Sequence, residues 1–204
     1  TTYPTAEAAL AGGLDQLRQH GFIREIDEND YRSCLDDRNK PDLIALAREN
    51  QLEAKSGWGK PRAARSGRGV CAQQAFVCYI ATVTEVDVTD MGKINIRRII
   101  SVVDAGRTVN PDIIAAQVQG GILFGMTAAL YGDITLKDGR VQQRNFNDYR
   151  MMRINEAPPI EVHIVPSHEM PGGIGEPGCT AGPPSLVNAI AAATGIRLRK
   201  LPID

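Results

Sequence analysis

One carboxylate stands alone in a stretch of glycine and proline near the C-terminus. Residues 171–178 read Pro-Gly-Gly-Ile-Gly-Glu-Pro-Gly, so Glu176 lies among four glycines and two prolines. Glycines adopt backbone conformations that other residues avoid and leave room for a ligand, while Pro177 restricts the residue before it. A carboxylate fixed in this way is suited to general-base catalysis. The local sequence is equally compatible with a tight turn in which Glu176 only caps a helix or meets an arginine.

A second polar group of residues lies near the middle of the chain. Gln117 and Gln119 precede Gly120 and Gly121, and Gly125 follows. Side-chain amides donate and accept hydrogen bonds, so they could hold a polar ligand. Each glycine costs a helix interior about 1 kcal/mol relative to alanine, so we expect another element or a ligand to lie close to this backbone. Taken alone, an ordinary solvated helix face remains the favoured interpretation of the glutamines.

The sulfur and imidazole side chains do not have the spacing of a metal site. The cysteines are Cys34, Cys71, Cys78 and Cys179, and the histidines are His20, His163 and His168. No two cysteines form a C-x-x-C pair, which gives zinc ribbons and iron-sulfur loops no support. Buried thiols are the expected state of the cysteines. A nucleophilic thiol, such as Cys179, paired with a histidine stays a minor alternative without a motif behind it.

Composition indicates a globular chain and excludes few partners. The 204 residues are 43% hydrophobic, which is enough for a buried core. The net charge of -1 gives no basis for a nucleic acid or an anionic membrane surface as partner. No apolar run in the sequence approaches the roughly 20 residues that a membrane span needs, and no secretion signal is visible at Thr1. Because the chain begins without Met, an upstream targeting segment is not excluded, and localisation stays open between periplasmic, membrane-associated and cytoplasmic.

The first part of the chain is expected to be mainly helical. Apolar spacing predicts helices over residues 5–20 and 41–56, with a shorter one over 31–35. Residues 60–69 contain basic residues and no acid, and we interpret them as an exposed linker in preference to a phosphate-binding segment. This places a boundary between a helical N-terminal segment, 1–60, and a second domain, 61–204.

The second domain is expected to begin with a hairpin. Residues 69–88 are rich in Val, Ile and Thr, and a turn over 90–93 leads into a strand over 94–103. The apolar register shifts between Val83 and Val86, which indicates a β-bulge.

Two helices and further strands complete the predicted domain. Asn110-Pro111-Asp112 predicts the start of a helix that runs to about Leu130. Lys137-Asp138-Gly139 predicts a hairpin turn, and residues 160–165 alternate as a strand. A last, buried helix is expected from about Pro183 to Thr194, with Gly195 as its stop. Hairpins with intervening helices favour an α+β fold of two layers, a mixed or antiparallel sheet with packed helices.

Eight short motifs in this order resemble the molybdopterin-binding large subunits of the xanthine dehydrogenase and aldehyde oxidase family. The resemblance is strong over 57–204, looser over 31–56, and greatest to the branch of isoquinoline 1-oxidoreductase and membrane-bound aldehyde dehydrogenases. The motifs are Gly67-Arg68-Gly69, Val103 to Pro111, Gln117 to Gly121, Asp138 to Gln143 with Asn145-Phe146, Asn155 to Pro158, Glu161 to Pro166, Gly172 to Gly178, and Leu198 to Pro202.

The resemblance implies roles for four residues. Glu176 is expected to be the catalytic base beside molybdenum, in an oxidation that transfers water-derived oxygen to carbon and hydride to the metal. Gln117 is expected to bond the pterin, while Gly173 and Gly175 are expected to belong to the cofactor-binding loop. No side chain is expected to ligate molybdenum, which the family holds through the pterin dithiolene. The fold implied is that of the family's second molybdenum-cofactor-binding domain.

The resemblance also implies a larger assembly. The cofactor is expected to be molybdopterin in its cytosine dinucleotide form, with 2Fe-2S clusters on a small partner subunit. The upstream half of the large subunit is a second expected partner, a cytochrome c subunit is a further candidate, and an aldehyde or N-heterocycle is the expected substrate. Because family large subunits are several times longer, the isolated chain is expected to be inactive.

Two features depart from this picture. Residues 179–182, Cys-Thr-Ala-Gly, replace the more apolar, proline-containing stretch that the family leads us to expect after Gly178. This leaves the local shape of the pocket in doubt. A non-catalytic module that keeps the fold for assembly or binding is the alternative function, although such a module would have little reason to keep a base at the position of Glu176.

Overall fold

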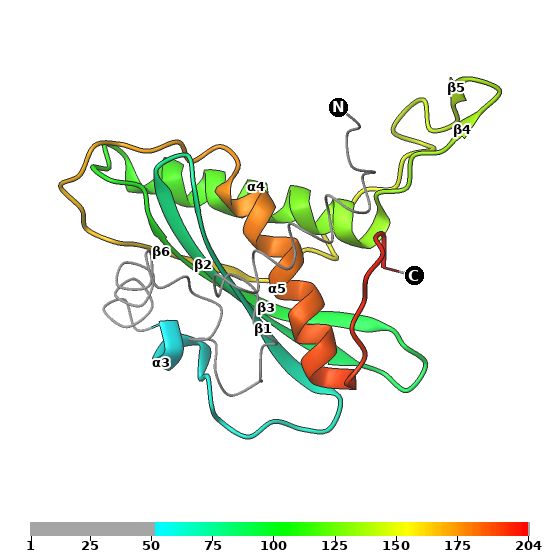
Figure 1. The fold of residues 1–204 in the computed structure, drawn as a ribbon, viewed down its shortest axis with the longest axis horizontal. Helices are drawn as coiled ribbons and strands as arrows, with labels where there is room; N and C mark the ends of the chain where they lie inside the picture. Colours follow the sequence, from blue (N-terminus) through cyan, green and yellow to red (C-terminus); the bar gives the residue numbers. More distant parts are fainter. Residues whose placement is uncertain (1–51, 204) are drawn as a thin grey trace, which may run out of the picture.

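The computed structural model describes residues 52–203 (Figure 1). The helices predicted over 5–20 and 31–35, and most of the one over 41–56, lie outside these residues. The first described helix, α3 (Leu52–Ser56), ends where the sequence predicts, because Gly57 adopts the left-handed φ of +66°. The division of the chain into segments 1–60 and 61–204 stays a prediction.

A four-stranded sheet forms the centre of the domain. It consists of β1 (Ser66–Ala75), β2 (Cys78–Val88), β3 (Ile94–Asp104) and β6 (Ile160–Ile164), in the order β1-β2-β3-β6. The first three strands are successive antiparallel neighbours, whereas β6 pairs parallel with β3. The strand predicted over 160–165 and the turn before β3 are confirmed.

Residues 69–88 do not form one strand, as the sequence predicts, but lie in two strands. The segment is divided into β1 and β2 by a two-residue turn at Phe76 and Val77, whose φ angles are +53° and +63°. Turns of this kind normally contain Asn, Asp or Gly, because few other residues tolerate positive φ at both positions. Phe76 and Val77 are typical strand residues, so the sequence carried no signal for the turn.

The bulge predicted between Val83 and Val86 of β2 occurs at this point of the sheet, but its extra residue lies on the partner strand, β3. Glu85 lies opposite Arg98 of β3, and the next residue, Val86, lies opposite Ile96, so one residue of β3 is skipped at this point. The extra residue, Arg97, lets Ile96 and Ile99 of β3 lie in the same core cluster although they are three residues apart.

Helix α4 (Pro111–Tyr131) begins as predicted. The Asn110 side chain accepts hydrogen bonds from the backbone N–H groups of Asp112 and Ile113. After α4, the chain leaves the sheet and forms a short hairpin of β4 (Leu136–Lys137) and β5 (Arg140–Val141), which projects from the body of the domain in Figure 1.

Helix α5 (Pro177–Thr194) begins earlier than predicted. The sequence prediction placed its start near Pro183, because proline lacks the N–H of a helix interior. In the structure Pro183 and Pro184 lie inside the helix, and Pro177 is its first residue. Glu176 is therefore the N-cap residue of α5. The end at Gly195, with φ +74°, is confirmed.

Both long helices cover one face of the sheet. Val118, Ile122 and Met126 of α4 pack with Leu186 and Ile190 of α5 in a core that includes the helix-facing residues of β2 and β3. A smaller cluster on the other face contains Leu52 of α3 and apolar residues of β1, β2 and β3. This arrangement is the predicted α+β fold (Figure 1).

The sequence predicts that no apolar segment is long enough to span a membrane, and this prediction needs one correction. Helix α4 is long and apolar enough to cross a membrane, judged by length and composition. In the structure, however, α4 lies against α5 and contributes Val118, Ile122 and Met126 to the core. Core helices commonly meet the same criterion.

Candidate functional site

Residues 171–175 form a loop before α5, called the glycine loop below. Glu176 lies at the junction between this loop and α5. It has φ -110° and ψ -22°, and its side chain makes no capping hydrogen bond to the helix. The carboxylate is exposed, and no described residue forms an ion pair with it. A negative charge is favourable at this end of a helix. The capping alternative from sequence is therefore wrong for the side chain, although Glu176 does occupy the cap position.

The structure brings Gln117 and the glycine loop together. The Gln117 side-chain amide on α4 donates a hydrogen bond to the carbonyl of Gly175, with an N–O distance of 3.2 Å. Gly175 and Gly120 are both open, since a Cβ built on either would meet no atom within 4 Å. Gly120 lies one helical turn after Gln117, so its open backbone follows the amide along α4.

Gly173 lies on the other side of the loop, against the turn between β1 and β2. Its backbone N–H donates to the carbonyl of Phe76 at 2.8 Å, and a Cβ at the adjacent Gly172 would lie 2.6 Å from the carbonyl oxygen of Val77. Only glycine fits such an approach at Gly172. The unusual turn at Phe76 and Val77 is thus tied to the loop that carries Glu176.

Two of the three glycines predicted to lie close to another element, Gly121 and Gly125, contact α5, whereas Gly120 does not. A Cβ at Gly125 would lie 2.3 Å from the carbonyl oxygen of Cys179, and one at Gly121 would lie 3.2 Å from the amide nitrogen of Cys179. The prediction that another element or a ligand lies close to this backbone is therefore confirmed at both residues, where the neighbouring element is α5. Gly120 faces away from α5 and has no such neighbour.

The sequence interpretation did not identify Gln73 of β1. Its side-chain nitrogen donates to the carbonyl of Pro177 at 3.3 Å and also contacts the hydroxyl oxygen of Thr180. Gln73 therefore reaches the first turn of α5 from the edge strand. Its neighbour Gln74 instead donates to the Tyr79 hydroxyl. Identical side chains at successive strand positions give no sign of which one faces the loop.

The thiols in this region are not activated. Burial raises the pKa of Cys179, and the nearby charge of Glu176 raises it further. Burial likewise raises the pKa of Cys78, with Asp104 adding to the effect. A nucleophilic cysteine needs a lowered pKa. The structure thus gives the cysteine-nucleophile alternative no support.

A different carboxylate organises the far end of β1. Glu85 is 7% exposed and pairs with Arg68 at 2.7 Å, Arg98 at 3.1 Å and Arg62 at 3.3 Å. Burial alone would raise the pKa of Glu85, but hydrogen bonds from Arg98 and Arg68 outweigh it and hold the pKa below its usual value. Arg68 and Arg98 also donate to the carbonyls of Gly57 and Ser56 at the end of α3.

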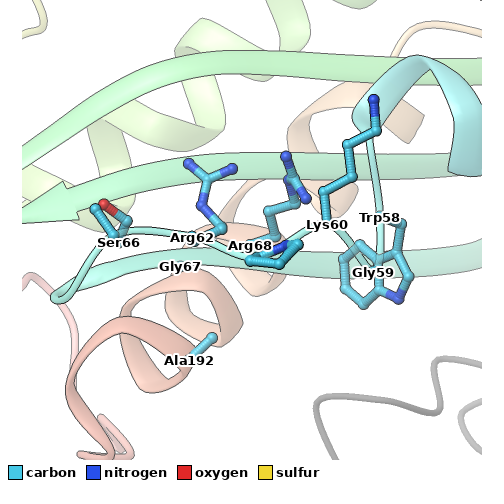
Figure 2. Close-up of a pocket in the computed structure, with 10 residues that line it drawn as sticks. Trp58, Gly59, Lys60, Arg62, Ser66, Gly67, Arg68 and Ala192 are labelled. Carbon is cyan, nitrogen blue, oxygen red and sulfur yellow. The ribbon is translucent and has the colours of Figure 1, made fainter.

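A cavity of about 370 Å³ lies beside this arginine cluster. Figure 2 shows Trp58 at one side of it, with the side chains of Lys60, Arg62 and Arg68 directed to the same side of β1. The linker predicted over 60–69 is partly wrong, because its last four residues begin β1 and two of its arginines pair with Glu85. None of the four residues predicted from sequence to act at the site lines this cavity.

The donor groups around Glu176 suit an organic cofactor. Among residues 52–203, no three His, Cys, Asp or Glu side chains are grouped to hold a metal ion. The loop and α4 instead offer the Gln117 amide, open glycine backbone at Gly120 and Gly175, and a carboxylate without an ion-pair partner in the described part of the chain. These groups fit a cofactor that is held by hydrogen bonds and carries its own metal ligands.

Comparison with known proteins agrees with this arrangement. Residues 16–158 match the family model of a molybdopterin cofactor-binding domain. The glycine loop and α5 lie after the matched segment. The chain is 35% identical over 153 residues to isoquinoline 1-oxidoreductase subunit beta of Brevundimonas diminuta, covering 72% of this chain and 20% of that protein.

Two further relatives support the match. The chain is 34% identical over 159 residues to a membrane-bound aldehyde dehydrogenase of Gluconacetobacter polyoxogenes, covering 75% of this chain and 21% of the relative. That relative is named for pyrroloquinoline quinone, so the cofactor assignment rests on the family model. The aldehyde oxidoreductase structure from Desulfovibrio desulfuricans has a TM-score of 0.53 and 28% identity, and covers 61% of this chain and 14% of that one. The chain spans about a fifth of these curated relatives.

Proposed function

Because the chain belongs to the molybdopterin cofactor-binding domain family, in large subunits of the xanthine dehydrogenase type, we propose that it forms the C-terminal part of a molybdenum hydroxylase active site. In this proposal Glu176 is the catalytic base, and Gln117, Gly173 and Gly175 bind the cofactor. The single observation that carries the proposal is the exposed carboxylate of Glu176, which has no ion-pair partner among residues 52–203, on a backbone that neighbouring elements hold in place.

Glu176 is suited to accept a proton. Its carboxylate has no described ion-pair partner that would have to be displaced, whereas the carbonyl of Gly175 before it and that of Pro177 after it are both hydrogen-bonded. A general base must lie within hydrogen-bond reach of the proton it takes, so a fixed backbone with an available side chain is favourable. The proton would come from the water-derived oxygen that is added to the substrate carbon.

Gln117 can serve the loop and a cofactor together. Its amide nitrogen holds the Gly175 carbonyl, and its side-chain oxygen remains able to accept hydrogen bonds from ring N–H groups. Gly175 and Gly120 would let such a ring approach closely, because no neighbouring atom lies where a Cβ would be. When bound, the molybdenum cofactor would supply the two-electron acceptor and the activation of the oxygen.

The rest of the proposed enzyme lies in other chain segments and subunits. We propose the upstream half of the large subunit and an iron-sulfur small subunit with 2Fe-2S clusters as partners, and a cytochrome c subunit as a further candidate. The substrate class is an aldehyde or an N-heterocycle, since both kinds of oxidoreductase occur among the relatives by name. The cytosine dinucleotide form of molybdopterin is proposed from the family resemblance.

The Glu176→Gln variant of the complete enzyme tests the base. The amide keeps the size of the side chain and removes its basicity, so turnover should fall by about 10²- to 10⁴-fold while molybdenum and pterin content stay unchanged. Glu169→Gln is the matched control, because Glu169 is exposed in the same loop region and should leave turnover unchanged. Full turnover in Glu176→Gln with full cofactor content would overturn the assignment and favour a non-catalytic module.

The isolated chain provides a second test. Purified alone, the 204-residue chain should neither retain stoichiometric molybdenum nor oxidise an aldehyde or N-heterocycle. Metal analysis and a dye-reduction assay would measure this. A fully loaded and active isolated chain would show that the active site is complete within it.

A further inference from the structure

We propose that Gln73 is a positioning residue for the loop that carries Glu176. The inference rests on the proposed function and adds a residue of β1 to it. Two glutamines from different elements donate hydrogen bonds to the backbone carbonyls of the residues before and after Glu176. Gln117 of α4 donates to the Gly175 carbonyl before it, and Gln73 donates to the Pro177 carbonyl after it.

Thr180 extends the contact of Gln73 to Glu176 itself. The Thr180 hydroxyl lies 3.3 Å from the carbonyl oxygen of Pro177 and 3.4 Å from that of Glu176, and it can donate its one hydrogen to either. The Thr180 backbone N–H donates to the Glu176 carbonyl at 3.1 Å. An amide nitrogen has two hydrogens, and a hydroxyl can accept one hydrogen bond while it donates another. Gln73 can therefore donate to Pro177 and Thr180 together, and Thr180 can pass the constraint to Glu176.

The loop needs such support because glycine gives it little of its own. Ordering a glycine costs more backbone entropy than ordering any other residue, and Gly175 has no neighbouring atom where a Cβ would be. Gln73, by contrast, lies on a strand that is paired with β2 along its length, directly opposite Ile80. The same hairpin also holds the loop upstream of Glu176, through the Phe76 carbonyl and the Gly173 N–H.

Contacts from the turn end of the β1–β2 hairpin, at Gln73 and Phe76, therefore constrain the backbone that carries the carboxylate. A displacement of about 1 Å can cost a positioned catalytic group about 100-fold in rate. Loss of the Gln73 contacts should lower kcat and leave KM nearly unchanged, because the loop would still be present but less constrained. Cofactor content should not change, since Gln117 and its contact with Gly175 remain.

The test compares Gln73→Met with Gln74→Met in the complete enzyme. Methionine has a similar length and no donor, and Gln74 contacts Tyr79 and not the loop. We expect Gln73→Met to lower kcat by about 10- to 100-fold, with KM within about threefold of wild type. Hydrogen–deuterium exchange of the backbone amides of residues 174–180 should become faster in Gln73→Met only. Gln74→Met should match wild type in both measurements.

Thr180→Val provides an independent variant of the same contact. It keeps the shape of the side chain and removes the hydroxyl, so it should reproduce the effect, and the double variant should be no worse than the more impaired single one. If Gln73→Met does not fold, Thr180→Val carries the test alone. Unchanged exchange and kcat in the variants that fold would overturn the proposal.

The two proposals fail in different ways. Faster exchange in Gln73→Met, together with full turnover in Glu176→Gln, would retain the positioning of the loop and overturn the role of the base. Loss of turnover in Glu176→Gln, with unchanged exchange and kcat in Gln73→Met, would overturn only the role of Gln73.

Discussion

Two carboxylates near opposite ends of β1 are held in opposite ways. Glu85 is buried, and three arginine side chains pair with its carboxylate. Glu176 is exposed, and the surrounding structure instead holds the backbone on either side of it, while its side chain has no described ion-pair partner. Three arginines approach one carboxylate oxygen of Glu85, whereas the Glu176 carboxylate has no described ion-pair partner and, in the proposed function, is available to another molecule.

Electrostatic perturbation alone would select Glu85 and not the proposed base, Glu176. The arginines shift the pKa of Glu85, and a cavity lies beside their cluster. Yet each of these interactions has a structural use, because Arg68 and Arg98 also hold the C-terminal carbonyls of α3. Ion-pair networks perturb pKa values without catalysis.

The largest predicted effect separates the two carboxylates by stability. Glu85→Gln should lower the free energy of unfolding of the full chain by about 3 kcal/mol, because it removes the carboxylate that pairs with Arg62 and Arg68 and leaves Arg98 with Glu161 alone. Glu176→Gln should change it by less than about 0.5 kcal/mol, as expected for an exposed side chain without partners. Urea denaturation followed by circular dichroism would measure both. Equal losses in the two variants would contradict the comparison.

The next prediction concerns the backbone support beneath Glu176. Gly125→Ala should destabilise the chain by about 2 kcal/mol, because the new Cβ would lie 2.3 Å from the Cys179 carbonyl oxygen and push α5 away from α4. In the complete enzyme the same change should lower turnover, since α5 carries Glu176 at its N-terminus. Denaturation midpoints and steady-state rates would report the two effects separately. An unaltered midpoint would mean that the helices separate at little cost.

Acid should remove the contribution of Glu85 selectively. Its pKa is lower in the folded chain than its usual value, so its stabilising contribution is present above that usual value and is lost as pH falls through the folded pKa. The stability gap between wild type and Glu85→Gln should therefore narrow as pH falls below about 5, by at most about 1.4 kcal/mol per pH unit. A gap that widens with acid would reverse the assigned direction.

The smallest predicted effect has the opposite sign. Gly120→Ala should stabilise the full chain by up to about 1 kcal/mol, because alanine is the better helix former and no atom lies within 4 Å of the new Cβ. If the cofactor or the upstream half covers this position, the complete enzyme should lose cofactor content while the separate chain gains stability. Thermal denaturation and molybdenum analysis would distinguish these outcomes.

Local sequence signals predicted the parts of the fold that depend on neighbouring residues. The Asn110 cap and the end of α5 at Gly195 each follow from a few adjacent side chains, whereas the bulge predicted on β2 lies on β3. The start of α5 was missed because Pro183 and Pro184 resemble a helix start. The turn at Phe76 and Val77 was missed because only a distant segment, the loop around Gly172, accounts for its contacts.

The sequence predicted the main residues of the candidate site, but not the residues that hold its loop in place. Glycines around one carboxylate and glutamines beside helix glycines drew attention to Glu176 and Gln117, and the contact of Gln117 with Gly175 brings these motifs together. Gln73 could not be selected over Gln74, since their difference depends on which side of an edge strand faces α5. The pairing of Arg62 and Arg68 with Glu85 likewise depends on long-range packing that a linker-like composition hides.

The parallel pairing of β6 with β3 has a consequence for the order of folding. Strands β1 to β3 are joined by short turns and can pair with little loss of chain entropy, whereas Ile160 reaches Ile99 only after α4 and the β4–β5 hairpin have been traversed. We expect the three-stranded meander to form in the folding nucleus, and β6, the glycine loop and α5 to join after the rate-limiting step. Substitutions around Glu176 should then accelerate unfolding and leave the folding rate nearly unchanged.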